Sequence, residues 1–289
     1  YLKPSDAGDE GTDAQMFESF DSDGFSLNGD TDGNGSGRTY VAWQWKCNGG
    51  TTSSLSGNLD SVVQVNATAG FSIVKYTGSG GNGQSVSHGL GLTPEVIITK
   101  SRNADQSWHM YHKSIGNTKI IKLDTTAAQA TSSDYSAAAV NSSSFFVSTS
   151  LIYVGELGAD YVSYCFAPIQ GYSKFGSYVG NGNANGPYVH CGFKPAFVLI
   201  KNVDVTQVWI MYDGKRKSFN QDAAVNSIYA SEVSAEYTGA SYHNLDILSN
   251  GFKIRLTDAS QNGNGNKHIY MAFAENPFVT SEGSPTTAR

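Results

Sequence analysis

The chain has 289 residues, of which 39% are hydrophobic and only 15% are charged. Its formal net charge is −6, and its 19 basic residues are spread thinly along the sequence. Because a nucleic-acid partner requires a concentrated basic surface, we expect no binding to nucleic acid. No apolar run reaches the ~18 to 20 residues that cross a bilayer, so we expect no membrane span. The 32 glycines, 16 tyrosines and 14 phenylalanines are typical of an all-β protein that is rich in turns.

The first element in chain order is a short β unit that ends in the strand sequence TYVAWQWK, residues 39–46. The same ending occurs again as DYVSYCFAP (160–168) and as KHIYMAFAE (267–275). A recurring ending of this kind indicates an internal repeat. Since only the last strands of the first copy are present, we predict that residues 1–46 are the C-terminal part of a preceding β domain.

Within this first unit, the loop GDTDGNGSG contains Asp30, Asp32 and Asn34 at the spacing that begins a calcium-binding loop. The twelfth position of such a loop supplies a bidentate carboxylate, but here it is Val41. In the matching loop of the last copy, Ser260 replaces Asp32. We therefore predict an Asn-Gly hairpin turn with positive φ, and retain the three residues only as a secondary metal candidate.

The rest of the chain is dominated by a long repeat. The stretch KYTGSGGNGQSVSHGLGLTPEVIITK returns as SYVGNGNANGPYVHCGFKPAFVLIK, and beyond it Trp108 aligns with Trp209 without a gap. We predict the following organisation: a Ser/Gly/Asn-rich linker at 47–69, one repeat at 70–168, a second repeat at 169–279 and a polar tail at 280–289.

The sequence pattern of each repeat predicts a series of short strands. Stretches such as FSIVKYT, EVIITK, FVLIK and VWIMYD are β-branched and aromatic, and Gly, Asn, Asp or Pro bound them. Several are apolar on both alternating faces, which places them inside a two-layer structure. Only residues 125–140 would tolerate a helix, and they are small and polar enough to form a loop. We predict an all-β fold of tandem antiparallel β-sandwich repeats of about 100 residues each.

Two motifs resemble cofactor or metal sites. Gly78-x-Gly80-x-x-Gly83 follows a strand, as a dinucleotide fingerprint does, but three helix breakers and then another strand come next. We therefore predict a glycine-rich hairpin loop and no cofactor. His109-x-x-His112 has metal-ligand spacing, but the second copy has Ile and Asp at these positions, which favours packed or surface histidines.

Other recurring side chains are expected to be structural. His88 and His190 occupy the same turn of the two copies, so we expect each to hydrogen-bond to the main chain, with ligand binding as the alternative. Trp108 and Trp209 are expected to be core anchors, because a tryptophan and a tyrosine three positions later point to opposite faces of a strand.

The sequence contains no motif of a hydrolase nucleophile or a metalloprotease, and we expect no enzyme activity. Paired carboxylates of a glycosidase meet in space rather than along the chain, so this one activity stays open. Recognition is expected instead in loops that are rich in Tyr, Ser, Gly and Asn, as in antibody paratopes. The candidate contact residues in these loops are Tyr135, Tyr172, Lys174, Tyr237, Tyr242 and His243.

The motifs GFSIVKYTGSGGNG, HGLGLTPEVIITK, GFKPAFVLIKN, DILSNGFKIR and YMAFAENPF together resemble a glycine-rich repeated β domain of tail-fibre and other virion proteins of tailed bacteriophages. Such domains are found above all in marine and cyanobacterial phages, and they often follow a concanavalin-A/laminin-G-like domain. The resemblance covers residues 20–279. It brings no catalytic residues that could be transferred to positions in this chain.

The resemblance implies a virion protein that is assembled in the host cytoplasm and acts outside the cell. Its implied role is a tail fibre or receptor-binding component that attaches to a glycan or protein of the host surface. The implied partners are other virion proteins and further copies of the chain in a homotrimer, which would cover edge strands. Two alternatives remain: a purely architectural virion protein, such as a head decoration or baseplate element, and a tailspike enzyme that degrades polysaccharide.

Overall fold

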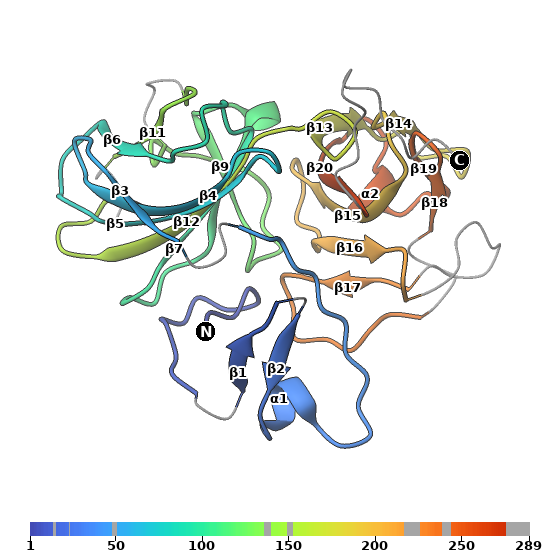
Figure 1. Ribbon diagram of the computed structural model, residues 1–289. Coiled ribbons are helices and arrows are strands. Elements are labelled where there is room, and N and C mark those ends of the chain that lie inside the picture. Colours follow the sequence, from blue (N-terminus) through green and yellow to red (C-terminus); the bar gives the residue numbers. More distant parts are fainter. Residues whose placement is uncertain are drawn as a thin grey trace.

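The protein is all-β, and two antiparallel β-sandwiches lie side by side with the N-terminal residues beneath them (Figure 1). This computed structural model describes residues 1–13, 16–22, 24–47, 51–135, 140–148, 153–216, 226–238 and 244–275. The predicted fold class is thus confirmed. No helix in these residues is long and apolar enough to cross a bilayer.

The first sandwich consists of an eight-stranded sheet and a two-stranded sheet. The large sheet has the order β10-β9-β8-β7-β12-β5-β4-β3. Its strands are β3 (Ser53–Leu55), β4 (Ser61–Asn66), β5 (Phe71–Thr77), β7 (Val96–Ser101), β8 (His109–His112), β9 (Lys119–Lys122), β10 (Ala130–Thr131) and β12 (Asp160–Phe166). The small sheet pairs β6 (Gln84–Ser87) with β11 (Ser144–Val147). A 3-10 turn, η1 (Lys113–Ile115), follows β8.

The segment 47–69 is not the linker that its composition predicted. It contributes β3 and β4, and β4 pairs with β5 along its whole length. Val63 of β4 is 2% exposed in the sandwich core. The composition hides these strands because Ser53, Ser54 and Ser61 lie within them, although Val63 and Val65 point inward.

The second sandwich repeats this plan. Its five-stranded sheet has the order β13-β20-β15-β16-β17 and its three-stranded sheet the order β14-β19-β18. The strands are β13 (Ser173–Val179), β14 (Tyr188–His190), β15 (Pro195–Asn202), β16 (Ile210–Asp213), β17 (Ile228–Tyr229), β18 (Leu245–Leu248), β19 (Gly251–Ile254) and β20 (Lys267–Ala274). The recurring endings form β12 and β20, which pair with strands on both sides.

Residues 1–46 form a partial third unit. Its elements β1 (Phe17–Phe20), β2 (Phe25–Leu27) and α1 (Thr31–Asn34) follow the order of β18, β19 and α2 (Ala259–Asn262). The correspondence extends to single hydrogen bonds. Asn34 Nδ2 donates to the Asn28 carbonyl, as Asn262 Nδ2 donates to the Leu256 carbonyl in the equivalent place. We call residues 1–46 the third sector.

The matched tryptophans connect consecutive units. Trp209 Nε1 of the second sandwich donates to the Lys122 carbonyl of the first at 2.8 Å. Trp108 Nε1 of the first sandwich donates to the Lys3 carbonyl of the third sector at 2.9 Å. Both indoles are buried, at 6% and 1% exposure for Trp108 and Trp209. The predicted role as core anchors is therefore confirmed, and the same contact joins each unit to the one before it.

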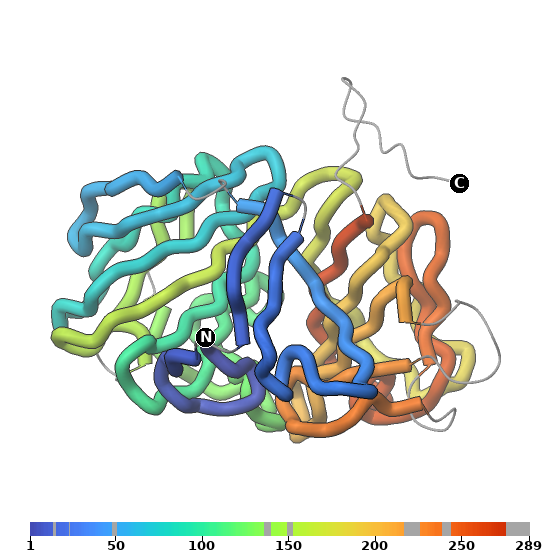
Figure 2. Tube along the Cα trace, turned by 60° about the horizontal axis from the view of Figure 1, so that its bottom comes forward, coloured from blue at the N-terminus to red at the C-terminus, as the bar shows by residue number. Residues whose placement is uncertain are grey.

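The described residues form three apolar cores. One lies inside each sandwich, and the third lies between the outer faces of the two large sheets. At this third core the repeat-equivalent residues Trp45, Phe166 and Phe273 meet, with ring centroids 5.4 to 6.4 Å apart. Figure 2 shows the third sector lying across the junction of the two sandwiches. From this sector, Trp45 contacts Phe166 and Phe273. We call this shared core the junction core.

The two predictions about loops have different outcomes. The glycine-rich loop after β5 contains no helix, and Gly80 and Gly83 have φ of 74° and 64°. It is not a hairpin, however, because it crosses to β6 in the opposite sheet. The helix-tolerant segment 125–140 is a loop with the short strand β10 in its described part, which excludes 136–139.

Replacing Phe273 by alanine should destabilise the protein by about 3 to 5 kcal/mol, because it removes the ring that contacts both partners in the junction core. Leu157→Ala is the control, since Leu157 is 76% exposed and should change stability by less than ~0.5 kcal/mol. Chemical denaturation measures both. Equal stability of the two variants would contradict the structural role of the junction core.

Candidate functional site

The predicted recognition residues do not form one surface. Tyr135 is 1% exposed, and its hydroxyl donates to Thr99 Oγ1 at 2.9 Å and to the His109 carbonyl at 3.0 Å. It is a core residue, so the prediction that it contacts a receptor is wrong. Its Ser- and Ala-rich surroundings resemble a loop, but its ring fills the first sandwich.

The other candidates that the structure describes lie at opposite edges of the second sandwich. Tyr172 is half-buried beside Phe273, with ring centroids 6.1 Å apart, and Lys174 Nζ donates to the His190 carbonyl at 2.7 Å. Both lie at β13, whereas Tyr237 lies beyond β17 at the other end of the sheet order. Tyr242 and His243 are outside the described residues.

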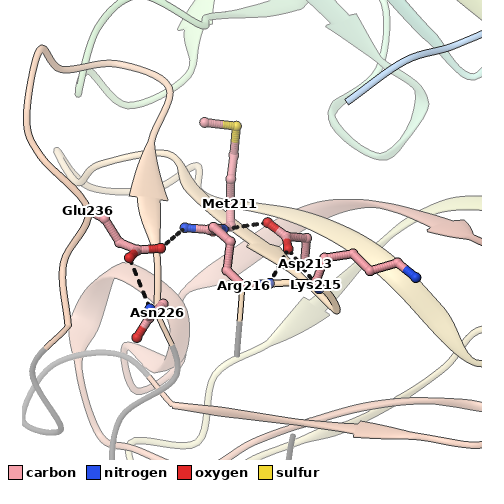
Figure 3. Close-up of polar contacts among 6 residues, drawn as sticks. All are labelled: Met211, Asp213, Lys215, Arg216, Asn226 and Glu236. Carbon is pink, nitrogen blue, oxygen red and sulfur yellow. Dashed lines mark hydrogen bonds and ion pairs between the residues drawn. The ribbon is translucent and has the colours of Figure 1, made fainter. Parts of the chain in front are cut away.

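Arg216 binds Glu236, the residue that precedes Tyr237 (Figure 3). Asp213 at the end of β16 accepts from Arg216 Nε at 2.5 Å, and Arg216 Nη1 donates to Glu236 at 2.8 Å. Asn226 Nδ2 donates to the second oxygen of Glu236 at 2.9 Å. The Arg216 side chain is only 11% exposed, so this pairing is shielded from solvent. We call these residues the Arg216 cluster.

The Arg216 cluster connects three parts of the chain. Arg216 Nη2 donates to the Met211 carbonyl of β16 at 3.1 Å (Figure 3). Its guanidinium also lies over the Trp43 ring, 5.8 Å from the centroid. The main chain of Tyr237 forms a two-way bridge with Ser227. The half-exposed Tyr237 side chain is thus presented by a fixed segment beside the third sector.

A shallow pocket of about 290 Å³ opens where the third sector meets the first sandwich. Its lining combines aromatic rings with charges of both signs: Tyr1, Leu2, Glu10, Lys75, Arg102, Trp108, Val162 and Tyr164. Tyr164 stacks on Trp108 with ring centroids 6.3 Å apart and an angle of 21° between the planes. Burial, together with the charge of Glu10, raises the pKa of the Tyr164 hydroxyl. This is the Trp108 pocket.

The Trp108 pocket carries one fixed ion pair and one exposed cation. Arg102 Nε donates to Glu10 at 2.6 Å, with both side chains about one-third exposed. Lys75 on β5 is exposed to solvent. Aromatic surface beside exposed polar groups is the usual chemistry of a site for a sugar or a small organic ligand. Sequence reasoning missed this pocket, because its residues come together only through the fold.

A second polar pair lies deep in the first sandwich. His109 Nδ1 and Asp134 are 2.7 Å apart, and both side chains are fully buried. Tyr153 stacks on the His109 ring at 4.2 Å. The prediction of a packed histidine is confirmed. Among the described residues, no three His, Cys, Asp or Glu side chains gather closely enough to hold a metal ion.

The remaining histidines differ in their partners. His88 Nε2 lies 3.1 Å from the Asn141 carbonyl, and its Nδ1 accepts from the Leu90 amide, which confirms the expected main-chain role. His190 is exposed, and its ring lies 3.2 Å from the Tyr188 hydroxyl instead. The Nε2 of His112 reaches the Tyr270 carbonyl of the other sandwich at 3.3 Å.

The loop around Asp30 is a helical turn. Asp30 caps α1 by accepting the Asp32 amide at 2.6 Å, and Asp258 caps α2 in the same way. The predicted positive φ is wrong, because Gly35 has φ of −68°. A Cβ at Gly35 would lie 2.8 Å from the Thr31 carbonyl, which explains why glycine is needed. The acidic spacing that resembles a calcium loop is thus the signature of a helix cap.

Comparison with protein-family models finds one match, to the family described as a domain of unknown function (DUF7483), over residues 1–277. Comparison with curated proteins gives no significant match, and comparison with solved structures gives none either.

Acidification should destabilise the protein between pH 6.5 and 4. Burial lowers the pKa of His112 to about 4 and also lowers the pKa values of His88 and His268. The unfolded chain therefore binds more protons in this range, and the stability that neutral His112 contributes is lost as pH falls. The loss from His112 alone is about 3 kcal/mol. Urea unfolding at several pH values should show a smaller pH dependence for His112→Gln, and an unchanged slope would contradict this assignment.

Replacing Arg216 by alanine should destabilise the protein by about 3 kcal/mol, because Asp213 would lose its partner in a shielded place. Hydrogen exchange should accelerate in 226–238. Lys215→Ala is a matched control, since its ion pair with Glu275 is exposed and should contribute less than ~1 kcal/mol. Equal effects of the two neighbouring substitutions would show that the Arg216 cluster does not fix the Tyr237 segment.

Proposed function

This chain belongs to the DUF7483 family, and we propose that it is a structural protein of a tailed-bacteriophage particle that contacts the surface of the host cell. The resemblance of its repeats to tail-fibre and virion proteins supports this proposal. The observation that carries it is the junction core, because this one shared apolar core packs the two sandwiches against each other. Stiff β modules of this kind suit a part that transmits load and resists proteases.

In this proposal the host contact lies on the outer surface rather than in a deep cleft. The Trp108 pocket offers the exposed ring of Tyr1 and the partly exposed ring of Tyr164 beside the exposed cation Lys75, which suits a surface glycan that carries negative charge. Tyr237 offers a second contact on a fixed segment. Weak contacts of this kind add by avidity when several copies of the chain are present, as in a homotrimer.

A purely architectural role in the virion is the second candidate. It is favoured by the third sector, whose strands β1 and β2 form a sheet of only two strands among the described residues. Such an open sheet suits attachment to a neighbouring protein. A polysaccharide-degrading enzyme has less support, because Glu10 is the one carboxylate that lines the Trp108 pocket and it is paired with Arg102.

Fluorescently labelled protein should bind host cells and slow the adsorption of the phage. Lys75→Glu should weaken cell binding severalfold, because it reverses the charge beside the stacked rings of the Trp108 pocket. Lys215→Glu on the second sandwich is the control and should bind as the unmodified protein does. Absence of both labelling and competition by folded protein would overturn the host-contact role and leave the architectural one.

A further inference from the structure

The two sandwiches differ at one edge. In the first sandwich, the hairpin of β3 and β4 covers the edges of β5 and β6, because β4 pairs with β5 and Leu59, between β3 and β4, forms a bridge to Val86 of β6. In the second sandwich, β13 and β14 take the places of β5 and β6, but only residues 167–172 separate β12 from β13. This connection is too short for a hairpin, so the edge of the second sandwich is not covered in the same way.

Buried residues set the correspondence between the two edges. Val86 of β6 and Val189 of β14 are both buried, and each pairs with a buried phenylalanine of the neighbouring strand. The residues on either side of them point to the outer face of their sheets. The corresponding outward positions are Ser85 with Tyr188 and Ser87 with His190.

A single lysine closes the second sandwich at this edge. In the first sandwich, the Ser87 carbonyl at the end of β6 accepts from Ser61 Oγ of β4 at 2.7 Å. The equivalent His190 carbonyl at the end of β14 accepts from Lys174 Nζ of β13 at 2.7 Å. A lysine on an edge strand opposes the addition of a further strand. The edge therefore faces solvent but does not suit strand pairing, and a small ligand is the kind of partner that fits.

The outward positions of β14 carry large side chains where β6 has serines. Tyr188 is 45% exposed, and the His190 side chain next to it is also exposed. Opposite His190 on β19 is Gly251, where a Cβ would lie 2.0 Å from the Val189 carbonyl. Packing thus requires glycine there, and the position opposite His190 has no side chain that could cover the imidazole.

Hydrogen bonds fix the Tyr188 ring and the tautomer of His190. The Tyr188 hydroxyl donates its one proton to Asn250 Oδ1 at 2.7 Å. It therefore accepts at its 3.2 Å contact with His190 Nδ1, which leaves Nε2 of the neutral imidazole as an acceptor. Neither His190 Nε2 nor Asn250 Nδ2 has a partner in the described part of the chain. An acceptor and a donor thus remain available next to a fixed aromatic ring.

Two lysines give this place a positive charge. Lys253 lies opposite Tyr188 in the register of β14 and β19, and Lys253 and Lys174 each donate to a main-chain carbonyl. Neither lysine has a carboxylate partner among the residues that the structure describes, and Asp246 of the adjacent strand β18 is paired with Arg255. The unbalanced positive charge favours a ligand that carries an acidic group.

We propose that Tyr188, His190 and Asn250 form a binding site for a pyranose sugar that carries an acidic group. The face of the sugar ring packs on Tyr188, and two neighbouring hydroxyl groups bind His190 Nε2 and Asn250 Nδ2, one as donor and one as acceptor. The acidic group, a carboxylate or a phosphate, lies near the ammonium groups of Lys253 and Lys174. We call these five residues the Tyr188 site. This inference goes beyond the proposed function, because sugar binding there does not depend on a role in a phage particle.

The test is a titration of the isotope-labelled 289-residue protein with methyl glucuronide, followed by amide NMR. The amide signals of residues 188–190 and 250–253 should shift. The neutral methyl glucoside should bind severalfold more weakly, because it lacks the acidic group that the lysines attract. Glucose 6-phosphate is the third ligand, and its affinity relative to methyl glucuronide shows whether a phosphate or a carboxylate is preferred.

Substitutions separate the ring from the charge. Tyr188→Ser brings in the residue type of the equivalent position in the first sandwich, so the protein should fold and bind about tenfold more weakly. Tyr188→Phe keeps the ring and should lose less affinity. Lys253→Gln should weaken binding of methyl glucuronide severalfold and leave that of methyl glucoside unchanged. Lys215→Gln is the matched control, since the exposed pair of Lys215 with Glu275 is not part of the Tyr188 site.

Three results would overturn the proposal. One is the absence of shifts in residues 188–190 and 250–253 at sugar concentrations of up to about 50 mM, which would exclude even a weak site. Another is equal affinity for methyl glucuronide and methyl glucoside, which would show that the lysines do not select an acidic group. The third is an equal loss of affinity in Lys253→Gln and Lys215→Gln, which would indicate attraction by the overall charge of the protein rather than by the Tyr188 site.

Discussion

The contact between the outer faces of the two large sheets is the constraint on which the rest of the molecule depends. Each sandwich has its own core, so each could form a compact unit, but its large sheet would then expose a second apolar face. The junction core buries these faces against each other, and burial of one large aromatic ring contributes roughly 2 to 3 kcal/mol. Trp45 completes it from the third sector, in the position that Phe166 and Phe273 occupy in the other units. The relative placement of the Trp108 pocket and the Tyr237 segment therefore follows from side chains that recur in the repeat.

This constraint explains which features could be predicted from the sequence. The strand endings recur because each supplies one aromatic ring to the junction core, and so the repeat and the fold class were recognisable. The strand β4 was not, because its valines are mixed with Ser, Gln and Asn and its partner β5 only becomes evident in the folded sheet. The Asn-Gly turn was also misread, since Asn-Gly between two strands is typical of a hairpin with positive φ, whereas here it ends a one-turn helix that Asp30 caps.

The candidate site was harder to predict than the fold, for a physical reason. The Trp108 pocket is built from four separate segments, and Tyr164 joins Trp108 only because β12 and β7 are paired and β8 follows β7. No spacing along the chain encodes this contact. Tyr135 shows the opposite error, because a loop-like composition surrounds a ring that is needed in the core. Composition indicates where a chain can form loops, but burial decides which side chains of those loops remain available to a partner.

The third sector also shows how a strand that is not covered on both faces can persist in water. At the two inward positions near the end of strand β20, Ala272 and Ala274 are buried, whereas the third sector has Gln44 and Lys46 there, both exposed. These polar side chains and the nine acidic residues reduce the cost of leaving the face uncovered and oppose pairing between two copies of the same acidic sector. The charge distribution therefore disfavours indiscriminate strand pairing.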